Sequence, residues 1–205
     1  MGVYRPVNRR PGLLRALNCD APYGWVLLAV CALLVLLTAL SGEAGRAWLE
    51  YDRAALASGE LWRLATAHLV HLDLHHALLN CLGLLLMWIL FARDYPPRQW
   101  LLIVLASMAV IDAGLALWDS TLRWYVGSSG VLHGVMAAGT LAHLRRRERD
   151  GWLLAAFLVG KLIWEQGVGA LPLSGNDPVV VDAHLFGAAG GLAAAAFLKN
   201  RREPL

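Results

Sequence analysis

The sequence has little charge and few cysteines for its length. Of its 205 residues, 16% are Asp, Glu, Lys or Arg, whereas 58% are hydrophobic. A soluble domain of this size has too much surface for its volume to bury so much apolar area, which excludes a soluble globular domain. The three cysteines are odd in number and two lie in apolar runs, so a disulfide framework is not expected.

The sequence also has little excess of charge of either sign. The formal net charge is only +3, and the basic residues cluster between apolar runs instead of following one soluble face. This distribution argues against a nucleic-acid partner. The apolar residues come in blocks instead, which is typical of a membrane protein.

Six apolar runs predict an all-α, polytopic bundle of six transmembrane helices. Each has roughly 16–20 residues, near the minimum that crosses ~30 Å of hydrocarbon as a helix. Polar residues within the runs predict a compact bundle with a water-accessible interior. The predicted spans are residues 24–40, 74–91, 100–118, 129–144, 151–166 and 179–198.

The basic residues predict the orientation of these spans. Most of the 18 Lys and Arg lie before the first span, after the sixth, or in the connections that follow the second and the fourth. The positive-inside rule therefore places both termini in the cytoplasm. We expect a cytoplasmic N-terminal segment (1–23), a six-helix membrane domain (24–199) with a long outer loop (41–73) lying in the membrane interface, and a cytoplasmic tail (200–205).

With this topology, polar side chains from three spans lie at a similar depth in the outer half of the bilayer. Ser129 begins the fourth span, and His184 lies near the outer start of the sixth. The segment "HLDLHHALLN" places His71, His76 and Asn80 at the outer end of the second. An unpaired polar group in lipid costs several kcal/mol, so these groups are expected to face one another or a cavity.

Ser129 lies in "YVGSSGVLHG", between Gly127 and Gly130. Glycine permits a sharp turn and close approach of another helix. The first backbone N–H groups of a helix lack internal partners and favour developing negative charge. This pattern suits a serine nucleophile beside an oxyanion site. The alternative is that Ser129 only caps the helix and the glycines only allow packing.

His184 shares a helix face with Gly187 and Gly191, at i, i+3 and i+7. The fourth span carries small residues at four-residue spacing, starting from Gly130. Two such faces pack closely, which would bring the imidazole within reach of Ser129. The alternative is a polar side chain that is merely satisfied inside the bundle.

His76 and Asn80 lie at i and i+4 on one face of the second span. Both side chains donate hydrogen bonds, and together with the Ser129 N–H they would form an oxyanion hole. The alternative is interhelical hydrogen bonding, worth about 1 kcal/mol for each residue.

These segments resemble the rhomboid intramembrane serine proteases. The matching motifs are "HLDLHHALLN", "GSSG" with Ser129 as the serine, "HLFGAAGG" with His184 as the histidine, and "LWRL" at residues 61–64. Their order and spacing agree with that family over nearly the whole chain. "YVGSSGVLHG", "KLIWEQ" and "VVVDAHLFGAAGG" look like its rhombosortase branch in particular.

The resemblance implies an endopeptidase that cleaves a peptide bond in or near the transmembrane segment of its substrates, without metal or cofactor. It implies a Ser129–His184 dyad with no aspartate, and an oxyanion hole of His76, Asn80 and the Ser129 N–H. His71, His133 and the glycines at 127, 130, 187 and 191 would support the site.

The rhombosortase branch implies further that the substrates are secreted bacterial proteins with a C-terminal Gly-Gly-type sorting tail. We expect a monomer in the inner (cytoplasmic) membrane, and the charge distribution places the active site toward the periplasm.

One position departs from the common rhomboid pattern, in which a tyrosine follows the serine by four residues. Here that residue is His133, which faces the same side as Ser129. It could stack on His184, bond to it, or compete with it as the base, and we favour His184. Asp182 points away from His184, so it is not expected to be a triad acid.

Lys161 and Glu165 lie at i and i+4, so we predict an ion pair, with substrate recognition as a lesser alternative. The third span holds Asp112, for which the sequence indicates no partner.

Two other functions remain open from the sequence. The first is a metal site, because His68, His71, His75 and His76 are dense, although no H-E-x-x-H motif is present. The second is a catalytically inactive rhomboid-like protein that binds transmembrane helices. The presence of both Ser129 and His184 argues against it.

Overall fold

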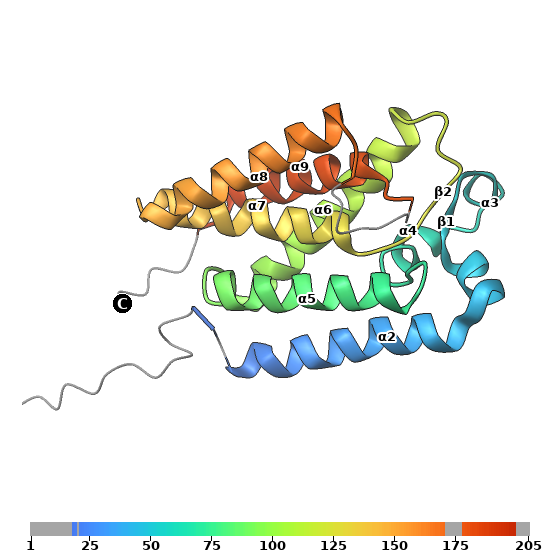
Figure 1. Cartoon of the computed structure of the whole chain (residues 1–205), viewed down its shortest axis with the longest axis horizontal. Coiled ribbons are helices and arrows are strands. Elements are labelled where there is room, and N and C mark those ends of the chain that lie inside the picture. The colour runs from blue at the N-terminus through green and yellow to red at the C-terminus, as the bar shows by residue number, and fades with distance from the viewer. Residues whose placement is uncertain (1–17, 20, 171–177, 200–205) are drawn as a thin grey trace, which may run out of the picture.

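The structure is a computed structural model that describes residues 18–19, 21–170 and 178–199 (Figure 1). Within these ranges the chain is mostly helical, with two very short strands. The elements are α2 (Ala21–Leu49), β1 (Tyr51–Asp52), α3 (Arg53–Ala57), α4 (Arg63–Thr66), α5 (Leu74–Phe91), α6 (Pro97–Leu117), β2 (Trp124–Tyr125), α7 (Ser129–Arg145), α8 (Arg149–Gly167) and α9 (Val181–Phe197).

Each of the six predicted spans contains a helix, and α5 has the predicted ends. Asp73 fixes the start of α5, because its carboxylate accepts a hydrogen bond from the His76 N–H at 2.8 Å. The largest difference is at the first span, where α2 continues to Leu49, into the predicted outer loop. The helix changes direction at Gly42 (φ 59°, ψ −167°), a backbone conformation that favours glycine.

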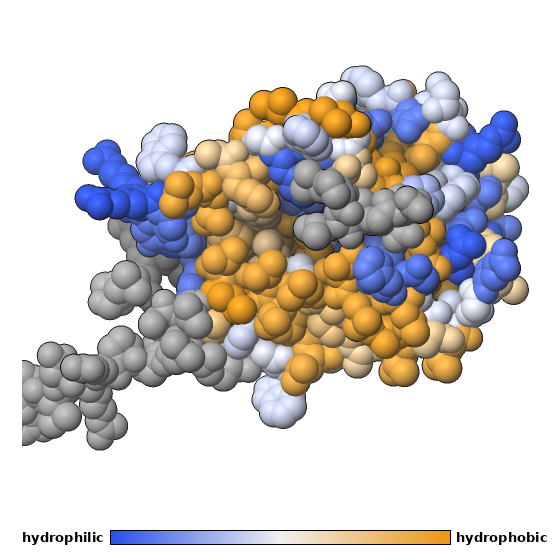
Figure 2. Space-filling view, in the orientation of Figure 1, coloured by the Kyte–Doolittle hydropathy of each residue, from blue (hydrophilic) through white to orange (hydrophobic). Residues whose placement is uncertain are grey.

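Within the described residues, three helices are long and apolar enough to cross a membrane, namely Pro22–Leu49, Leu74–Phe91 and Pro97–Leu117. The helix Val181–Phe197 is apolar but shorter. The molecule carries a broad apolar surface between two polar ends, as Figure 2 shows. These features identify a multi-pass membrane protein.

Helix α7 is the centre of the bundle, since it packs against α5, α6, α8 and α9. Ten of its 17 residues are buried. A helix surrounded by other helices needs no apolar outer face, which explains why α7 combines glycines and histidines with a modest apolar content.

Helices α7 and α9 approach each other through glycines. A Cβ added at Gly130 would lie 2.7 Å from the Ala183 carbonyl oxygen, and one at Gly187 would clash with the Gly130 backbone. Farther along, a side chain at Gly191 would meet the backbone of Gly134. This backbone-to-backbone packing fixes the two helices that carry Ser129 and His184.

The all-α prediction needs one correction, because β1 and β2 form a small antiparallel ladder. Tyr51 pairs with Tyr125, and Asp52 with Trp124. Just after β2, the Gly127 N–H donates to the Ala67 carbonyl oxygen at 2.9 Å. These backbone bonds tie the turn before α7 to the long loop that follows α2.

That long loop is folded, and buried Arg63 holds it to the end of α2. The guanidinium donates to the carbonyl oxygens of Ala47 and Glu50, each at 2.8 Å, and to the Glu60 carboxylate at 2.7 Å. The predicted N-terminal segment, apart from residues 18–19 and 21–23, and the predicted tail (200–205) lie outside the described residues. The predicted boundaries therefore stay a prediction.

Candidate active site

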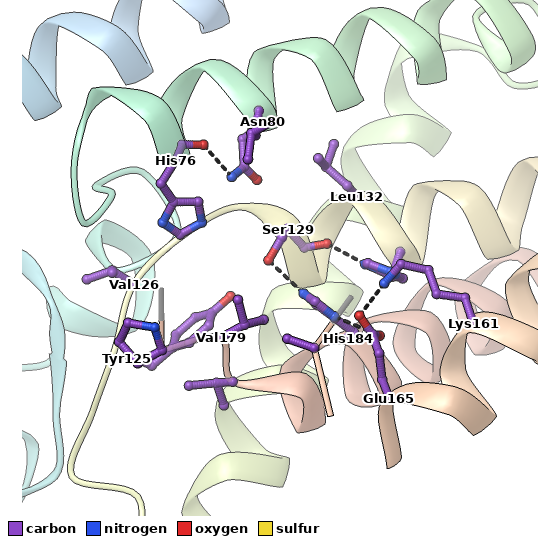
Figure 3. A pocket seen from close by; sticks show the side chains of 15 residues that line it. His76, Asn80, Tyr125, Val126, Ser129, Leu132, Lys161, Glu165, Val179 and His184 are labelled. Carbon is purple, nitrogen blue, oxygen red and sulfur yellow. Dashed lines mark hydrogen bonds and ion pairs between the residues drawn. The ribbon is translucent and has the colours of Figure 1, made fainter. Parts of the chain in front are cut away.

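Two helices that are far apart in sequence bring Ser129 and His184 together (Figure 3). The Ser129 hydroxyl lies 2.9 Å from His184 Nε2. Ser129 is the first residue of α7, and His184 lies in the first half of α9 with 5% of its surface exposed. A hydroxyl within hydrogen-bond distance of a buried imidazole is the arrangement that activates a serine.

Ser129 does not cap α7, so the capping alternative is wrong. The N-cap residue is Ser128, whose side chain makes no capping bond. Its hydroxyl instead donates to Asn80 Oδ1 at 3.0 Å and lies 3.3 Å from His71 Nε2. The Ser129 hydroxyl therefore makes no capping bond and is available to hydrogen-bond to His184.

Gly127 shapes the turn that presents Ser129. Its φ is +113°, and an added Cβ would lie 2.9 Å from the His76 ring. The Tyr125 hydroxyl donates to the Gly127 carbonyl oxygen at 2.6 Å and holds the turn in place. A residue with a side chain at this position would have a strained backbone, and its Cβ would displace His76.

His133 stacks on His184 and does not contact the Ser129 hydroxyl. The two ring centroids are 4.1 Å apart with an angle of 16° between the planes. His133 Nδ1 lies 2.7 Å from the Ser129 carbonyl oxygen, so this nitrogen carries the proton and donates it. Of the three arrangements left open by the sequence, the structure shows stacking.

Glu165 contacts the other nitrogen of His184, a contact that the sequence reasoning missed. Oε2 of this buried glutamate lies 2.9 Å from His184 Nδ1, and its Oε1 pairs with the Lys161 ammonium. The ion pair with Lys161 is the one predicted from their spacing. Asp182, on the same helix as His184, is half-buried.

On the opposite wall of the site lie His76 and Asn80, both on α5 (Figure 3). Asn80 is 3% exposed, and its amide donates to the His76 carbonyl oxygen at 2.9 Å. His71 meets His76 edge-on, with centroids 4.9 Å apart. The exposed His75 is not part of this group.

His71 lies before α5, and burial lowers its pKa to about 3, with a further contribution from nearby His76. The imidazole is therefore neutral at neutral pH. Nε2 of this neutral ring lies 3.3 Å from the Ser128 hydroxyl, and the contact links the long loop to the turn before α7.

A cavity of about 240 Å³ lies between these walls. Its polar lining includes Ser129, His184, His76 and Asn80, and its apolar lining includes Leu132. Space next to a serine–histidine pair, with donors facing it, is where a peptide carbonyl would be attacked.

The metal alternative has limited support among the described residues. The four dense histidines do not form a cluster there, because His75 is exposed and His68 lies 3.2 Å from Asp112, which supplies the missing partner of that carboxylate. Among the residues that the structure describes, the donor sets close enough for an ion are His133, Glu165 and His184, and separately His143, Glu148 and Asp150. In the first set the Lys161 ammonium already neutralises Glu165, which disfavours a cation.

Comparison with known proteins gives consistent matches. Residues 58–201 match the family described as the Rhomboid domain, which covers more than half of the chain. The rhomboid protease homologue YdcA of Bacillus subtilis (strain 168) is 25% identical over 148 residues, 72% of each chain.

Proposed function

Because the chain belongs to the rhomboid family, we propose that it is an intramembrane serine endopeptidase with Ser129 as nucleophile and His184 as general base. Rhomboid membrane proteases act on transmembrane substrates in the lipid bilayer. The observation that carries the proposal is the 2.9 Å contact between the Ser129 hydroxyl and His184 Nε2.

In the proposed reaction the Ser129 Oγ attacks the carbonyl carbon of the substrate, and its proton passes to His184 Nε2. The C–N bond then breaks, as the same proton passes to the leaving amine and an acyl-enzyme forms. Water attacks the acyl carbon, gives a proton to Nε2, and the acid is released as Ser129 recovers its proton. His184 thus serves first as base and then as acid.

Negative charge on the carbonyl oxygen would be held by the Ser129 N–H, the His76 ring and the Asn80 amide. The first residue of a helix has a free N–H that suits this role. The Asn80 amide donates one of its two N–H groups to the His76 carbonyl oxygen in the free protein, which leaves the other for the substrate. Loss of one such donor typically lowers the rate by ~10²–10³.

We propose further that α2 and α5 to α9 all cross the inner membrane, with both termini in the cytoplasm and the site toward the periplasm. The proposed substrates are secreted bacterial proteins with a C-terminal Gly-Gly-type tail, and the proposed state is a monomer. Motif likeness to the rhombosortase branch supports the substrate class, and the charge distribution supports the orientation.

A fluorophosphonate probe tests the nucleophile without knowledge of the substrate. We expect the detergent-solubilised protein to be labelled, and Ser129→Ala and His184→Ala to abolish labelling. Ser128→Ala is the matched control, and it should still be labelled at Ser129. Folded wild-type protein that stays unlabelled would contradict the proposal. If a chelator then abolished the activity of the protein, the metal alternative would be favoured.

The substrate class needs a separate test. A periplasmic reporter that ends in a Gly-Gly-containing transmembrane tail should be cleaved by cells with the wild-type protein and not by cells with Ser129→Ala. Cleavage of an unrelated transmembrane reporter, with the Gly-Gly tail left intact, would retain the protease and overturn this substrate class.

A further inference from the structure

His184 has two ring nitrogens, and each has a polar partner from a different helix. Nε2 meets the Ser129 hydroxyl on α7, and Nδ1 meets Glu165 Oε2 on α8, both at 2.9 Å. His184 and Glu165 are 5% and 3% exposed, so both side chains are largely shielded from solvent. The three side chains form a continuous hydrogen-bonded line from α8 to the cavity (Figure 3).

A carboxylate only accepts hydrogen bonds, so the contact with Glu165 decides which nitrogen of His184 carries the proton. Nδ1 must donate to Glu165, which leaves the Nε2 lone pair facing the Ser129 hydroxyl. This tautomer is the one that can take a proton from serine. When His184 becomes an imidazolium, the buried carboxylate also stabilises the new positive charge.

Lys161 holds the carboxylate in this position. Its ammonium pairs with Glu165 Oε1 one helical turn away, which leaves Oε2 for His184. An unpaired glutamate inside a membrane protein is costly, and the ammonium balances its charge. His133 packs on the flat face of the His184 ring, so the ring is held both at its edge and on its face.

We propose that Glu165 is the third member of a Ser129–His184–Glu165 triad, a positioning residue that orients His184 and stabilises its protonated form. The inference rests on the proposed function and departs from the dyad that the family resemblance implies. The proton of Ser129 moves to Nε2 and then to the leaving amine, while the Nδ1 proton stays between His184 and Glu165. Glu165 therefore gains and loses no proton during the cycle.

The test measures fluorophosphonate inactivation of the full chain in detergent, which separates the maximal rate from the probe concentration that gives half of it. For Glu165→Gln we expect the maximal rate to fall by about 10²–10⁴-fold, because the amide no longer enforces the tautomer. The half-saturating concentration should stay unchanged. Loss of a glutamate that merely joined two helices would not lower the maximal rate while leaving the half-saturating concentration unchanged.

Two further variants keep the test decisive. Lys161→Met with Glu165→Gln removes both charges, so no unpaired ammonium remains to prevent folding, and its maximal rate should still fall at least about tenfold. Asp182→Asn makes the same chemical change on the helix of His184, without contact to the imidazole, and should stay close to wild type.

The outcomes separate the two proposals. If wild-type Ser129 is not labelled, the proposed function itself fails. If the wild type is labelled and the charge-neutral double variant inactivates as fast, the protein is a dyad enzyme and the triad is overturned. An equal loss of the maximal rate in Asp182→Asn would also overturn the triad. The loss would then come from removing a negative charge anywhere near the site, and not from the contact of Glu165 with His184.

Discussion

At the scale of residues, the imidazole of His184 is held from three directions. Ser129 and Glu165 contact its two nitrogens, and the His133 ring covers its face. Catalysis by proton transfer depends on such orientation, since small misplacements of a base are costly to the rate. We therefore expect His133 to contribute through the packing of its ring more than through proton transfer.

Two substitutions at His133 separate packing from chemistry. His133→Ala removes the stacked ring, and we expect fluorophosphonate labelling to slow by about two- to tenfold, the value of one aromatic pair. His133→Phe keeps a ring and should recover most of that loss. If His133→Phe abolished labelling while His184→Ala retained it, His133 would be the base.

Buried His71 makes the stability of the protein depend on pH. Its folded-state pKa of about 3 is below the ordinary value of 6.5. Between these values the unfolded chain binds a proton that the folded protein excludes, so stability falls as the pH falls. His71 changes the free energy of unfolding by at most about 1.4 kcal/mol per pH unit in this range. Above pH 6.5 the free energy of unfolding no longer depends on the protonation of His71.

Unfolding temperatures measured in detergent between pH 8 and pH 5 test this contribution. Wild type should lose stability more steeply than His71→Gln as the pH falls below about 6.5. His75→Gln changes the exposed neighbouring histidine and should follow wild type. Parallel curves for wild type and His71→Gln would show that His71 binds its proton equally well in the folded protein.

At the scale of elements, the contact of α7 with α9 sets the distance between Ser129 and His184. Gly191 lies two helical turns beyond His184 and touches the α7 backbone at Gly134, away from the cavity. A larger residue there would push the helices apart without touching the reacting groups. We therefore expect the glycine face to contribute to activity through geometry alone.

Gly191→Val tests this role of the glycine face. Overpacking costs about 1–3 kcal/mol, so we expect a lower unfolding temperature together with slower labelling of Ser129. Leu192→Val, at the next position and 47% exposed, is the matched control and should change neither measurement. Normal labelling in Gly191→Val would mean that the two helices repack without moving the pair.

The helices follow from the sequence more directly than their contacts do. The apolar run predicts α5 at both ends, and the structure adds the Asp73 cap at its start. The β1–β2 pair has two residues in each strand, too few for any alternation to indicate a strand. The spacing of Lys161 and Glu165 predicts their ion pair, but which side of α8 meets His184 depends on how α8 and α9 cross.

At the scale of the whole molecule, cations hold helix ends at both ends of the bundle, and one end has a denser run of them. At the end with β1 and β2, Arg53 donates to carbonyl oxygens at the C-terminus of α6, and buried Arg63 to those at the end of α2. At the opposite end, Arg145 does the same for the last turn of α9. The opposite end gathers the last turn of α7 and the start of α8, with the arginine-rich segment 145–149. The charge bias that orients a membrane protein therefore favours that end for the cytoplasm.

Fusions of alkaline phosphatase and green fluorescent protein test this orientation. With six spans and the N-terminus inside, a fusion at residue 205 should fluoresce and show no phosphatase activity. A phosphatase fusion in the α6–β2 connection, at residue 121, should be active because that connection lies in the periplasm. The same result at both positions would mean that an even number of spans separates them, instead of the three helices α7, α8 and α9. The reverse result would place Ser129 and His184 near the cytoplasm, where the tail of an exported protein does not reach them, and would exclude the proposed substrates.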